Sequence, residues 1–503
     1  MRLDSSPTVT RGFGFVRRAA LPLVAVLALS ACAGMNATQP QATLLKAPAL
    51  GLSADPSTVV SLQDAWWREF GDAQLNRFID SALASNPSLK MAQARLARAL
   101  AAADITDAAS GPQLNAGVDA MRQKFTATGL YPPPLAGGIY ETGTAQLSGS
   151  LELDFFGRNR AALEAALGVA RAAQADAAAA RMLLASNAAR SYFQLIRLNE
   201  QLQVAQRLLT QRGQMLELVR QRLDAGLDTR LELRQSEGTL PEARLQIETL
   251  QEQITLGRNA LAALLGQTGA SLVLEIPASA AIRSMALATN VPSDLLGRRA
   301  DIAAARWRVE AATQDVGVAR AQFYPNLNLV AFAGFSSIGL DRLLDGASKQ
   351  WGVGPALRLP LFDGGRLRAN LRGKVAELDA AIESYNATVL DAVREVTDQL
   401  ASSQAISRQQ EAQRSAQNFA ESAYEIAVQR YEAGLGNLLQ VLNAETAVLA
   451  QRRMGVDLTA RALDTQVALM RALGGGYRAE LPVSVGMRCM DCGSGPMGWT
   501  PHL

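Results

Sequence analysis

The amino-acid sequence predicts a mainly α-helical chain with membrane-spanning β-strands, built from one unit that occurs twice. The pattern Arg-x-x-Ala-Gly ends at Gly226 and again at Gly434, an offset of 208 positions (434 − 226). Leucines recur at every seventh position from Leu195 to Leu223, which is typical of helices packed as a coiled coil. Alternating apolar and polar residues form stretches of about ten residues, the length of a tilted membrane-spanning strand.

The composition excludes several classes of protein. The 503 residues include one His, His502, so no zinc site with paired His, Ser-His-Asp triad or internal His base can form. Lys plus Arg number 49 against 46 Asp plus Glu, which leaves no basic surplus for nucleic acid. Cys489 and Cys492 stand in a Gly- and Met-rich tail, where a disulfide or disorder is favoured over a metal site. We therefore expect no enzyme, no metal, no dissociable cofactor and no nucleic-acid partner.

The N-terminus predicts a lipoprotein signal peptide over residues 1–31. Several Arg precede the apolar run Ala19–Cys32, which is too short to span a bilayer. The run ends in Leu-Ser-Ala-Cys, which resembles a bacterial lipobox with Cys32 as the site of lipid attachment. Ala33 follows instead of Asp, which favours sorting to the outer membrane. The alternative is a signal peptide that ends near a Cys by chance. With the lipid on Cys32, residues 32–65 are expected to form an extended N-terminal segment.

The first repeat is predicted over residues 66–265 and the second over 298–474, with an equatorial connection at 266–297 and a tail at 475–503. The elements expected in the first repeat are a helix at 87–110, strands at about 113–123 and 142–155, a long helix at 158–224, a tip turn and a return helix. Those expected in the second are a helix at 300–323, strands at about 326–336 and 351–361, a long helix at 366–432, a tip turn and a return helix.

The long helices follow from the absence of helix breakers. Residues 158–224 contain no Pro and two Gly, so a continuous helix there would be about 100 Å long. The return helix carries its own seven-residue repeat from Leu240 to Leu261, and Pro241 is predicted to kink it. These features indicate antiparallel helical hairpins.

The strands follow from alternation, which has two interpretations. Apolar Ala145, Leu147 and Leu151 alternate with polar Gln146 and Ser148, and the other predicted strands show similar alternation. A half-buried sheet of a soluble protein gives the same alternation. In lipid, a β-structure must close into a barrel, and four strands are fewer than the roughly eight of the smallest known barrels. Several chains would therefore share one barrel, with two or three chains as the possibilities.

Ordered motifs along the chain resemble the TolC/OprM-type outer-membrane efflux factors, in their NodT-like lipoprotein branch. The motifs are Trp66–Asp72 with Leu75, Asn86–Leu89, Leu296–Ile302, Phe323–Leu327, Leu361–Arg366, Arg430–Gly434 and Ala472–Gly476. Ala300 departs from the Pro that is usual in the third motif.

The resemblance implies a homotrimer in which twelve strands form a shared β-barrel and twelve long helices form a periplasmic α-barrel. It also implies a collar around the helices, expected at Asp55–Leu83, Gly266–Leu295 and from Gly474 onward. The implied partners are a periplasmic adaptor (membrane fusion) protein, an inner-membrane pump of the RND type and outer-membrane lipid. The implied location is the outer membrane, lipid-anchored and extending into the periplasm.

The tip turns supply candidate docking residues. Gly226 and Gly434 would end the long helices in a left-handed conformation, and Leu227 and Leu435 follow them. These positions are interpreted both as plain helix caps and as a docking site for an adaptor hairpin, and the two roles are compatible.

Acidic residues cluster near the predicted tips. The candidate aperture carboxylates are Asp224, Asp228 and Glu432, with Glu232, Glu237 and Glu445 nearby. Carboxylate rings from three chains would select cations or help to gate the aperture, whereas a solvated helix face is the alternative.

The sequence thus predicts the outer-membrane channel of a tripartite efflux system, a passive trimeric conduit that exports small molecules such as drugs and toxic organic compounds. One alternative is the channel of a type I protein-secretion or metal-efflux system. A second alternative is a structural coiled-coil lipoprotein without a channel.

Overall fold

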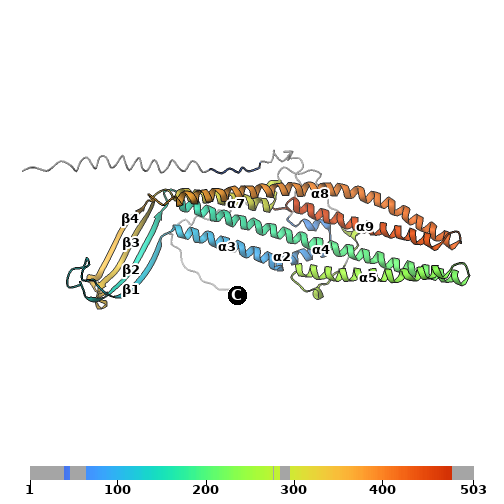
Figure 1. Cartoon of the computed structure of the whole chain (residues 1–503), viewed down its shortest axis with the longest axis horizontal. Coiled ribbons are helices and arrows are strands. Elements are labelled where there is room, and N and C mark those ends of the chain that lie inside the picture. The colour runs from blue at the N-terminus through green and yellow to red at the C-terminus, as the bar shows by residue number, and fades with distance from the viewer. Residues whose placement is uncertain (1–38, 46–63, 276, 284–294, 478–503) are drawn as a thin grey trace, which may run out of the picture.

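The computed structural model describes residues 39–45, 64–275, 277–283 and 295–477. The predicted signal peptide, Cys32, Cys489 and Cys492 lie outside these ranges. The chain is elongated, with a β-sheet at one end and the tips of two long helical hairpins at the other (Figure 1). No helix within the described ranges is both long enough and apolar enough to cross a membrane.

Both repeats contain a shorter helix, two strands and a long helical hairpin in the same order. The first comprises α3 (Pro87–Ser110), β1 (Gln113–Lys124), β2 (Ile139–Leu153), α4 (Arg158–Asp224) and α5 (Arg230–Leu264). The second comprises α7 (Ala300–Ala321), β3 (Asn326–Ile338), β4 (Lys349–Arg358), α8 (Arg366–Glu432) and α9 (Leu438–Ala472). Short elements precede each repeat, namely η3 (Trp66–Phe70), α2 (Ala73–Ser85) and α6 (Leu295–Arg298).

The helices agree closely with the expectation from sequence. The helices α4 and α8 have the predicted bounds, because no Pro interrupts either segment. The heptad positions form the seam between α4 and α5, where Leu198, Ala205, Ile247 and Leu250 are buried together. The helix α5 runs unbroken through Pro241 from Arg230 to Leu264, and the kink there stays a prediction.

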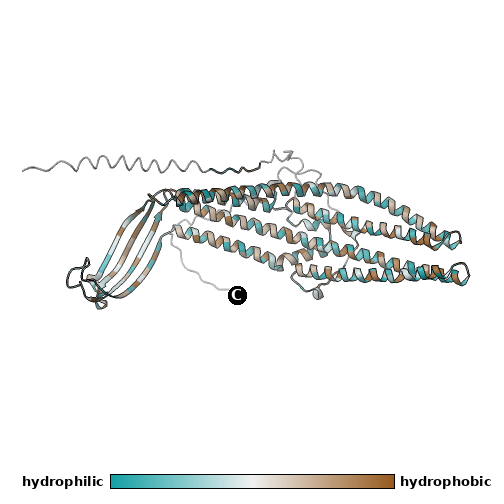
Figure 2. Cartoon of the chain, viewed as in Figure 1, coloured by the Kyte–Doolittle hydropathy of each residue, from teal (hydrophilic) through white to brown (hydrophobic). Residues whose placement is uncertain are grey.

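The four strands form one antiparallel sheet in the order β1-β2-β3-β4. The register places Leu147 opposite Ala333, and hydrophobic and hydrophilic residues alternate along the strands (Figure 2). One face is therefore mainly apolar and the other mainly polar. The edges β1 and β4 have no partner strand in the described part of the chain, so one chain leaves the sheet open.

The strands β1 and β3 extend one and two residues beyond their predicted ends, and β2 and β4 differ most from the predicted bounds. The strand β2 begins at Ile139 because the hairpin ladder continues until Ile139 pairs with Lys124, and it ends at Leu153. The strand β4 ends at Arg358, whereas the sequence predicted pairing up to residue 361. Its last pair joins Arg358 to Asn326, the first residue of β3, so the ladder ends where the partner strand begins.

An aromatic core lies midway along the helices. Trp66 and Phe70 of η3 pack against Phe193 of α4, with Leu261 of α5 and Leu469 of α9 buried in the same cluster. Because this core joins both repeats, it fixes the two hairpins side by side at this level.

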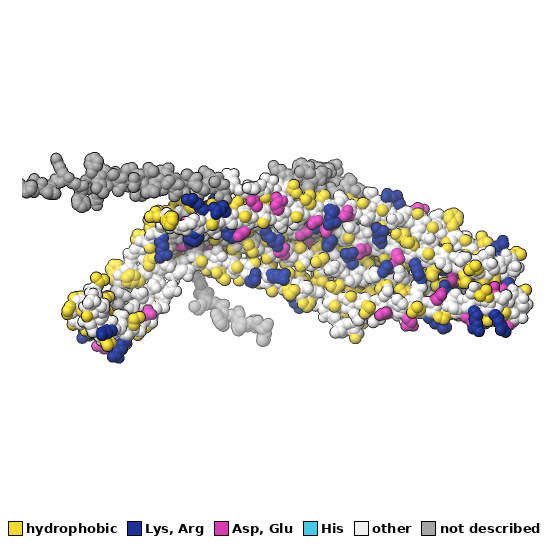
Figure 3. Space-filling model, viewed as in Figure 1, with side chains coloured by type: hydrophobic (Ala, Val, Ile, Leu, Met, Phe, Trp, Pro, Cys, Tyr) yellow, Lys and Arg dark blue, Asp and Glu magenta, His cyan; other side chains and the backbone are white. Residues whose placement is uncertain are grey.

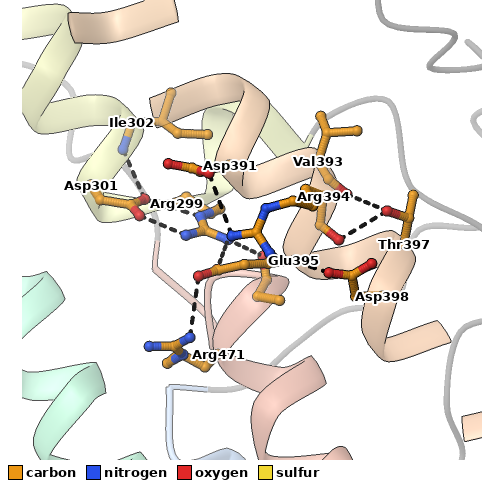
Figure 4. A network of polar contacts seen from close by, with 11 residues as sticks. Arg299, Asp301, Ile302, Asp391, Val393, Arg394, Glu395, Thr397, Asp398 and Arg471 are labelled. Carbon is orange, nitrogen blue, oxygen red and sulfur yellow. Dashed lines mark hydrogen bonds and ion pairs between the residues drawn. The ribbon is translucent and has the colours of Figure 1, made fainter. Parts of the chain in front are cut away.

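A buried ion-pair network joins the start of the second repeat to its hairpin (Figure 4). The Arg299 side chain is 9% exposed and donates to both carboxylate oxygens of Asp301, at 3.0 and 2.6 Å. Its Nη1 also donates to Glu395 of α8 at 2.9 Å and to the carbonyl of Ala472 in α9 at 3.0 Å. Glu395 accepts in addition from Arg471 at 3.2 Å. One guanidinium thereby ties together α7, α8 and α9.

Candidate functional site

The two hairpin tips end in the same helix-terminating motif. In the first, the N–H of Leu227 donates to the carbonyl of Arg222 at 2.8 Å, and that of Gly226 donates to Leu223 at 2.9 Å. The second tip repeats this pattern from Leu435 and Gly434. Gly226 and Gly434 have φ of 74° and 75°, the left-handed region that this motif requires.

The Leu that follows each Gly is exposed in the single chain. Leu227 is 65% exposed and Leu435 is 69% exposed. Because the hydrogen bonds of the turn come from the backbone, neither side chain is needed to close it. Each tip therefore exposes one apolar side chain that the hydrogen bonds of its turn do not require.

The returning helices begin with side-chain caps. The Thr229 hydroxyl accepts from the N–H of Leu231 at 3.2 Å, and Glu232 accepts from the N–H of Thr229 at 3.0 Å. The Asn437 side chain caps α9 by accepting from Gln440 at 3.0 Å. Glu232 is thus occupied as a helix cap. The Thr229 hydroxyl donates to its carboxylate, and this bond, followed by the backbone N–H donors, lowers the pKa of Glu232.

A polar network joins the two hairpins at the tip. Asp228, in the first turn, accepts from the Arg222 guanidinium at 3.2 Å and from the hydroxyl of Tyr431 in α8. The Arg222 guanidinium lies 4.5 Å above the Tyr431 ring and donates to the carbonyl of Glu432. Tyr431 packs against Val219 in a small apolar cluster. The network therefore crosses from α4 through the first turn to α8.

The electrostatics of this network favour a protonated Tyr431. Burial raises the pKa of the Tyr431 phenol, and its hydrogen bond to the charged Asp228 carboxylate raises it further, while Arg222 opposes both effects. The phenol consequently remains a donor to Asp228 at physiological pH.

The structure corrects the expected group of aperture carboxylates. The Asp228 side chain is only 7% exposed and is paired within the chain, so it does not face an aperture as a free charge. Glu445 is also buried and bonds to Arg212 at 3.0 Å, and Glu237 pairs with Arg234 at 2.8 Å. Asp224 and Glu432 lie exposed at the tips, where their role in an aperture stays a prediction.

The sequence reasoning missed Arg222 and Tyr431 as functional residues. In the sequence, Arg222 is only the first residue of the repeated Arg-x-x-Ala-Gly pattern, and Tyr431 only lies within the motif Arg430–Gly434. The available signal was an Arg on the predicted buried side of a helix end, where only a charged partner makes burial tolerable.

Loss of the tip network is expected to loosen the two hairpins. Asp228→Asn or Tyr431→Phe removes a buried hydrogen bond to a charged group, which costs about 1.5–3 kcal/mol. Spin labels at positions 227 and 435 should then give a broader and longer distance distribution in pulsed electron resonance. The control is Glu237→Gln, the same chemical change in a surface pair. Identical distributions in all variants would contradict a holding role.

A second link between the hairpins lies further from the tip. Arg212 of α4 donates to Glu445 of α9 and to the carbonyl of Thr239 in α5, at 3.0 and 2.7 Å. Burial raises the pKa of Glu445 despite Arg212, which lowers it, and nearby Glu242 raises it further.

This raised pKa sets a pH dependence of stability. The folded state binds the Glu445 proton more tightly than the unfolded state does, so protonated Glu445 stabilises the fold at low pH. This contribution to the free energy of unfolding is lost as pH rises through the raised pKa. We expect Glu445→Gln to match or exceed the wild-type thermal midpoint at pH 7.5, with its relative advantage shrinking toward pH 5. A variant that loses stability at pH 7.5 and not at pH 5 would show that the charged pair is favourable instead.

No cluster of three or more metal-ligating side chains occurs among the residues that the structure describes. The tips instead carry two exposed leucines, Leu227 and Leu435, and a buried polar network that joins the two hairpins. This arrangement is suited to holding the ends of the helices together and to contacting another protein.

Comparison with known proteins identifies a family that has the same sequence pattern over most of the chain. Residues 78–267 and 291–475 match the family described as outer membrane efflux protein. The matched segments cover both hairpins, both tip turns and all four strands.

Individual relatives match over most of the chain. The fusaric acid resistance protein FusA of Burkholderia cepacia is 37% identical over 363 residues, 70% of this chain and 68% of that protein. The outer membrane protein OprJ of Pseudomonas aeruginosa is 35% identical over 422 residues, 82% and 86% of the two chains. The crystal structure of the outer membrane protein VceC from Vibrio cholerae has a TM-score of 0.78 at 38% identity and covers 83% of this chain and 100% of that one.

Proposed function

This chain belongs to the outer membrane efflux protein family and is an outer-membrane efflux channel, and from that premise we propose that three copies form a passive conduit for small molecules. Its fold and family are those of channels. The observation that carries the proposal is the open four-stranded sheet joined directly to helices of 67 residues.

The sheet supports assembly from several copies. Its two edges need partners, because unpaired backbone groups are not tolerated in lipid. Three chains of four strands supply twelve (3 × 4), which leaves an aqueous path where eight strands would be filled by side chains. The apolar face would contact lipid and the polar face would line the conduit. The hairpins would continue that conduit into the periplasm as an α-barrel.

The proposed cargo is a set of small organic molecules. Relatives carry the names fusaric acid resistance protein and multidrug resistance outer membrane protein. The channel itself would perform no chemistry, so the choice of cargo would lie mainly with its partners. Those partners are a periplasmic adaptor at the exposed Leu227 and Leu435 and an inner-membrane pump of the RND type.

The described N-terminal segment supports a lipid anchor on Cys32. The backbone N–H groups of Gln41 and Ala42 donate to Asp379 of α8 at 2.9 and 3.0 Å. Asp379 lies 13 residues (379 − 366) from the sheet end of α8, about 20 Å along the helix. Seven residues (39 − 32) separate Cys32 from the segment and span at most about 25 Å. A lipid on Cys32 can therefore reach the level of the sheet.

Reconstitution tests the proposal. The purified protein should migrate as a heat-modifiable trimer and give discrete conductance steps in planar bilayers. Cells lacking their own channel should regain drug export when the chain is supplied with its adaptor and pump. A protein that forms trimers but never conducts would contradict the conduit, and Cys32→Ser should abolish labelling by palmitate without abolishing conductance.

A further inference from the structure

A cavity of about 370 Å³ lies where the sheet meets the helices. It is lined by the ends of β2 and β4, the start of β3 and the first residues of α4 and α8. The lining residues come from both repeats of the chain.

The strand register places this cavity on the polar face of the sheet. Glu152 pairs with Asn328, and Asn326 pairs with Arg358. These four residues line the cavity and share a face with the polar Ser148 and Ser150. In the conduit proposed above, this is the face that borders the aqueous path, at the base of the barrel.

The lining holds three Arg and two carboxylates, a net charge of +1 (3 − 2). Arg158 pairs with Glu152 at 2.7 Å, and Asp154 accepts from the backbone N–H of Arg160 at 2.9 Å. Arg358 and Arg366 also line the cavity, and both side chains are exposed. Neither lies in a close ion pair within the described ranges, but the charge of Arg366 helps to lower the pKa of Asp363, after the backbone hydrogen bonds that Asp363 accepts. Two guanidinium groups are therefore available to a ligand.

The starts of the long helices bring both signs of charge to the cavity. Both α4 and α8 begin with Arg-x-Arg, and neither has an acidic residue in its first turn. An aspartate precedes each start and caps it: Asp154 accepts from the N–H of Arg160 at 2.9 Å, and Asp363 accepts from the N–H groups of Gly365 and Leu367 at 2.9 and 2.7 Å. Basic side chains gather at this bend on the face shown in Figure 3.

Two aromatic rings line the same cavity as these arginines. Phe156 and Tyr324 stack with ring centroids 4.7 Å apart and an interplanar angle of 11°. Both rings remain partly exposed in the single chain. They give the cavity that holds Arg358 and Arg366 a flat apolar surface, and a planar carboxylate is the anion that a guanidinium matches with two parallel hydrogen bonds.

We propose that this cavity is a binding subsite for aromatic carboxylates, which it holds transiently at the base of the barrel. Arg358 and Arg366 receive the carboxylate, and Phe156 and Tyr324 contact the ring. The inference names a cargo class for the conduit, and its location on the aqueous path rests on the proposed function. The subsite itself belongs to the single chain and can be tested without conduction.

Calorimetric titration of the detergent-solubilised full-length protein with 2-naphthoate tests the subsite. We expect Arg358→Gln/Arg366→Gln to raise the Kd at least about tenfold, the size of one lost charge-assisted hydrogen bond. The neutral analogue 2-naphthalenemethanol should bind weakly to both proteins. The matched control is Arg122→Gln/Arg342→Gln, which removes the same charge near the other end of the sheet and should leave the Kd unchanged.

The subsite is overturned if wild type and Arg358→Gln/Arg366→Gln bind 2-naphthoate equally. It is also overturned if the control variant loses as much affinity as Arg358→Gln/Arg366→Gln does. Binding of acetate as tight as 2-naphthoate overturns the aromatic part. In planar bilayers 2-naphthoate should block the wild-type current more strongly than that of the double variant. A protein that binds 2-naphthoate but never conducts would contradict the proposed function and leave the subsite supported.

Discussion

Replacing Gly434 with proline should abolish export while leaving lipidation and trimer formation intact. Gly434 has a φ of 75°, whereas the proline ring fixes φ near −65°. Proline also removes the N–H that donates to Tyr431 at 3.0 Å. The turn would rearrange, and Leu435 would no longer lie where an adaptor could contact it. The measurement is drug susceptibility of cells that depend on this channel.

Two further variants separate docking from folding. Gly434→Asn should retain most export, because Asn tolerates the left-handed conformation better than other residues with a side chain. Leu435→Glu leaves the backbone motif intact and replaces the exposed apolar side chain with a charge. We expect it to reduce export and adaptor cross-linking together. Unimpaired export by Gly434→Pro would refute the docking role of this turn.

Of the substitutions proposed for this protein, Arg299→Ala should cause the largest loss in the free energy of unfolding. The variant leaves Asp301 and Glu395 without their main partner and frees the carbonyl of Ala472. Removing one member of a buried ion pair costs about 3–5 kcal/mol, and the partial exposure of Asp301 places this case near the lower limit. Denaturation in detergent, followed by circular dichroism, should show the midpoint at a lower guanidinium concentration.

A pH series adds a signature specific to this network. Burial raises the pKa of Asp301, but the hydrogen bonds and charge of Arg299 outweigh burial, and the net shift is downward. The stabilising contribution is therefore present above the unfolded-state pKa and is lost as pH falls through the folded-state pKa. Arg299→Ala should lose this acid-sensitive component. The surface variant Arg394→Ala should alter stability little, and an equal loss in both would contradict the assigned role of Arg299.

Local features of the sequence predicted the elements well. The helices α4 and α8 have the expected bounds because Gly-terminated turns and long Pro-free segments are local properties. The bounds of β2 and β4 were less accurate, because the extent of a ladder depends on where the partner strand begins and ends.

The pairing of charges could not be predicted from sequence. Asp228 looked like a free tip carboxylate, yet it bonds to Tyr431, 203 positions away (431 − 228). Glu445 was also counted among the acidic residues near the tips, yet it is buried and pairs with Arg212. The period of a helix shows which residues share a face, but not which neighbour covers that face.

By itself, the sequence determined the duplicated unit, its strands and its two long hairpins, because periodicity and turn chemistry act over a few neighbouring residues. Only the tertiary structure decided that Arg222, Asp228 and Tyr431 join the hairpins, that Arg299 ties three helices together, and that two arginines line one cavity with a stacked aromatic pair. Each of these sites joins residues from separate elements, most of them far apart along the chain. Their chemistry arises when packing brings them within hydrogen-bonding distance in a partly desolvated setting.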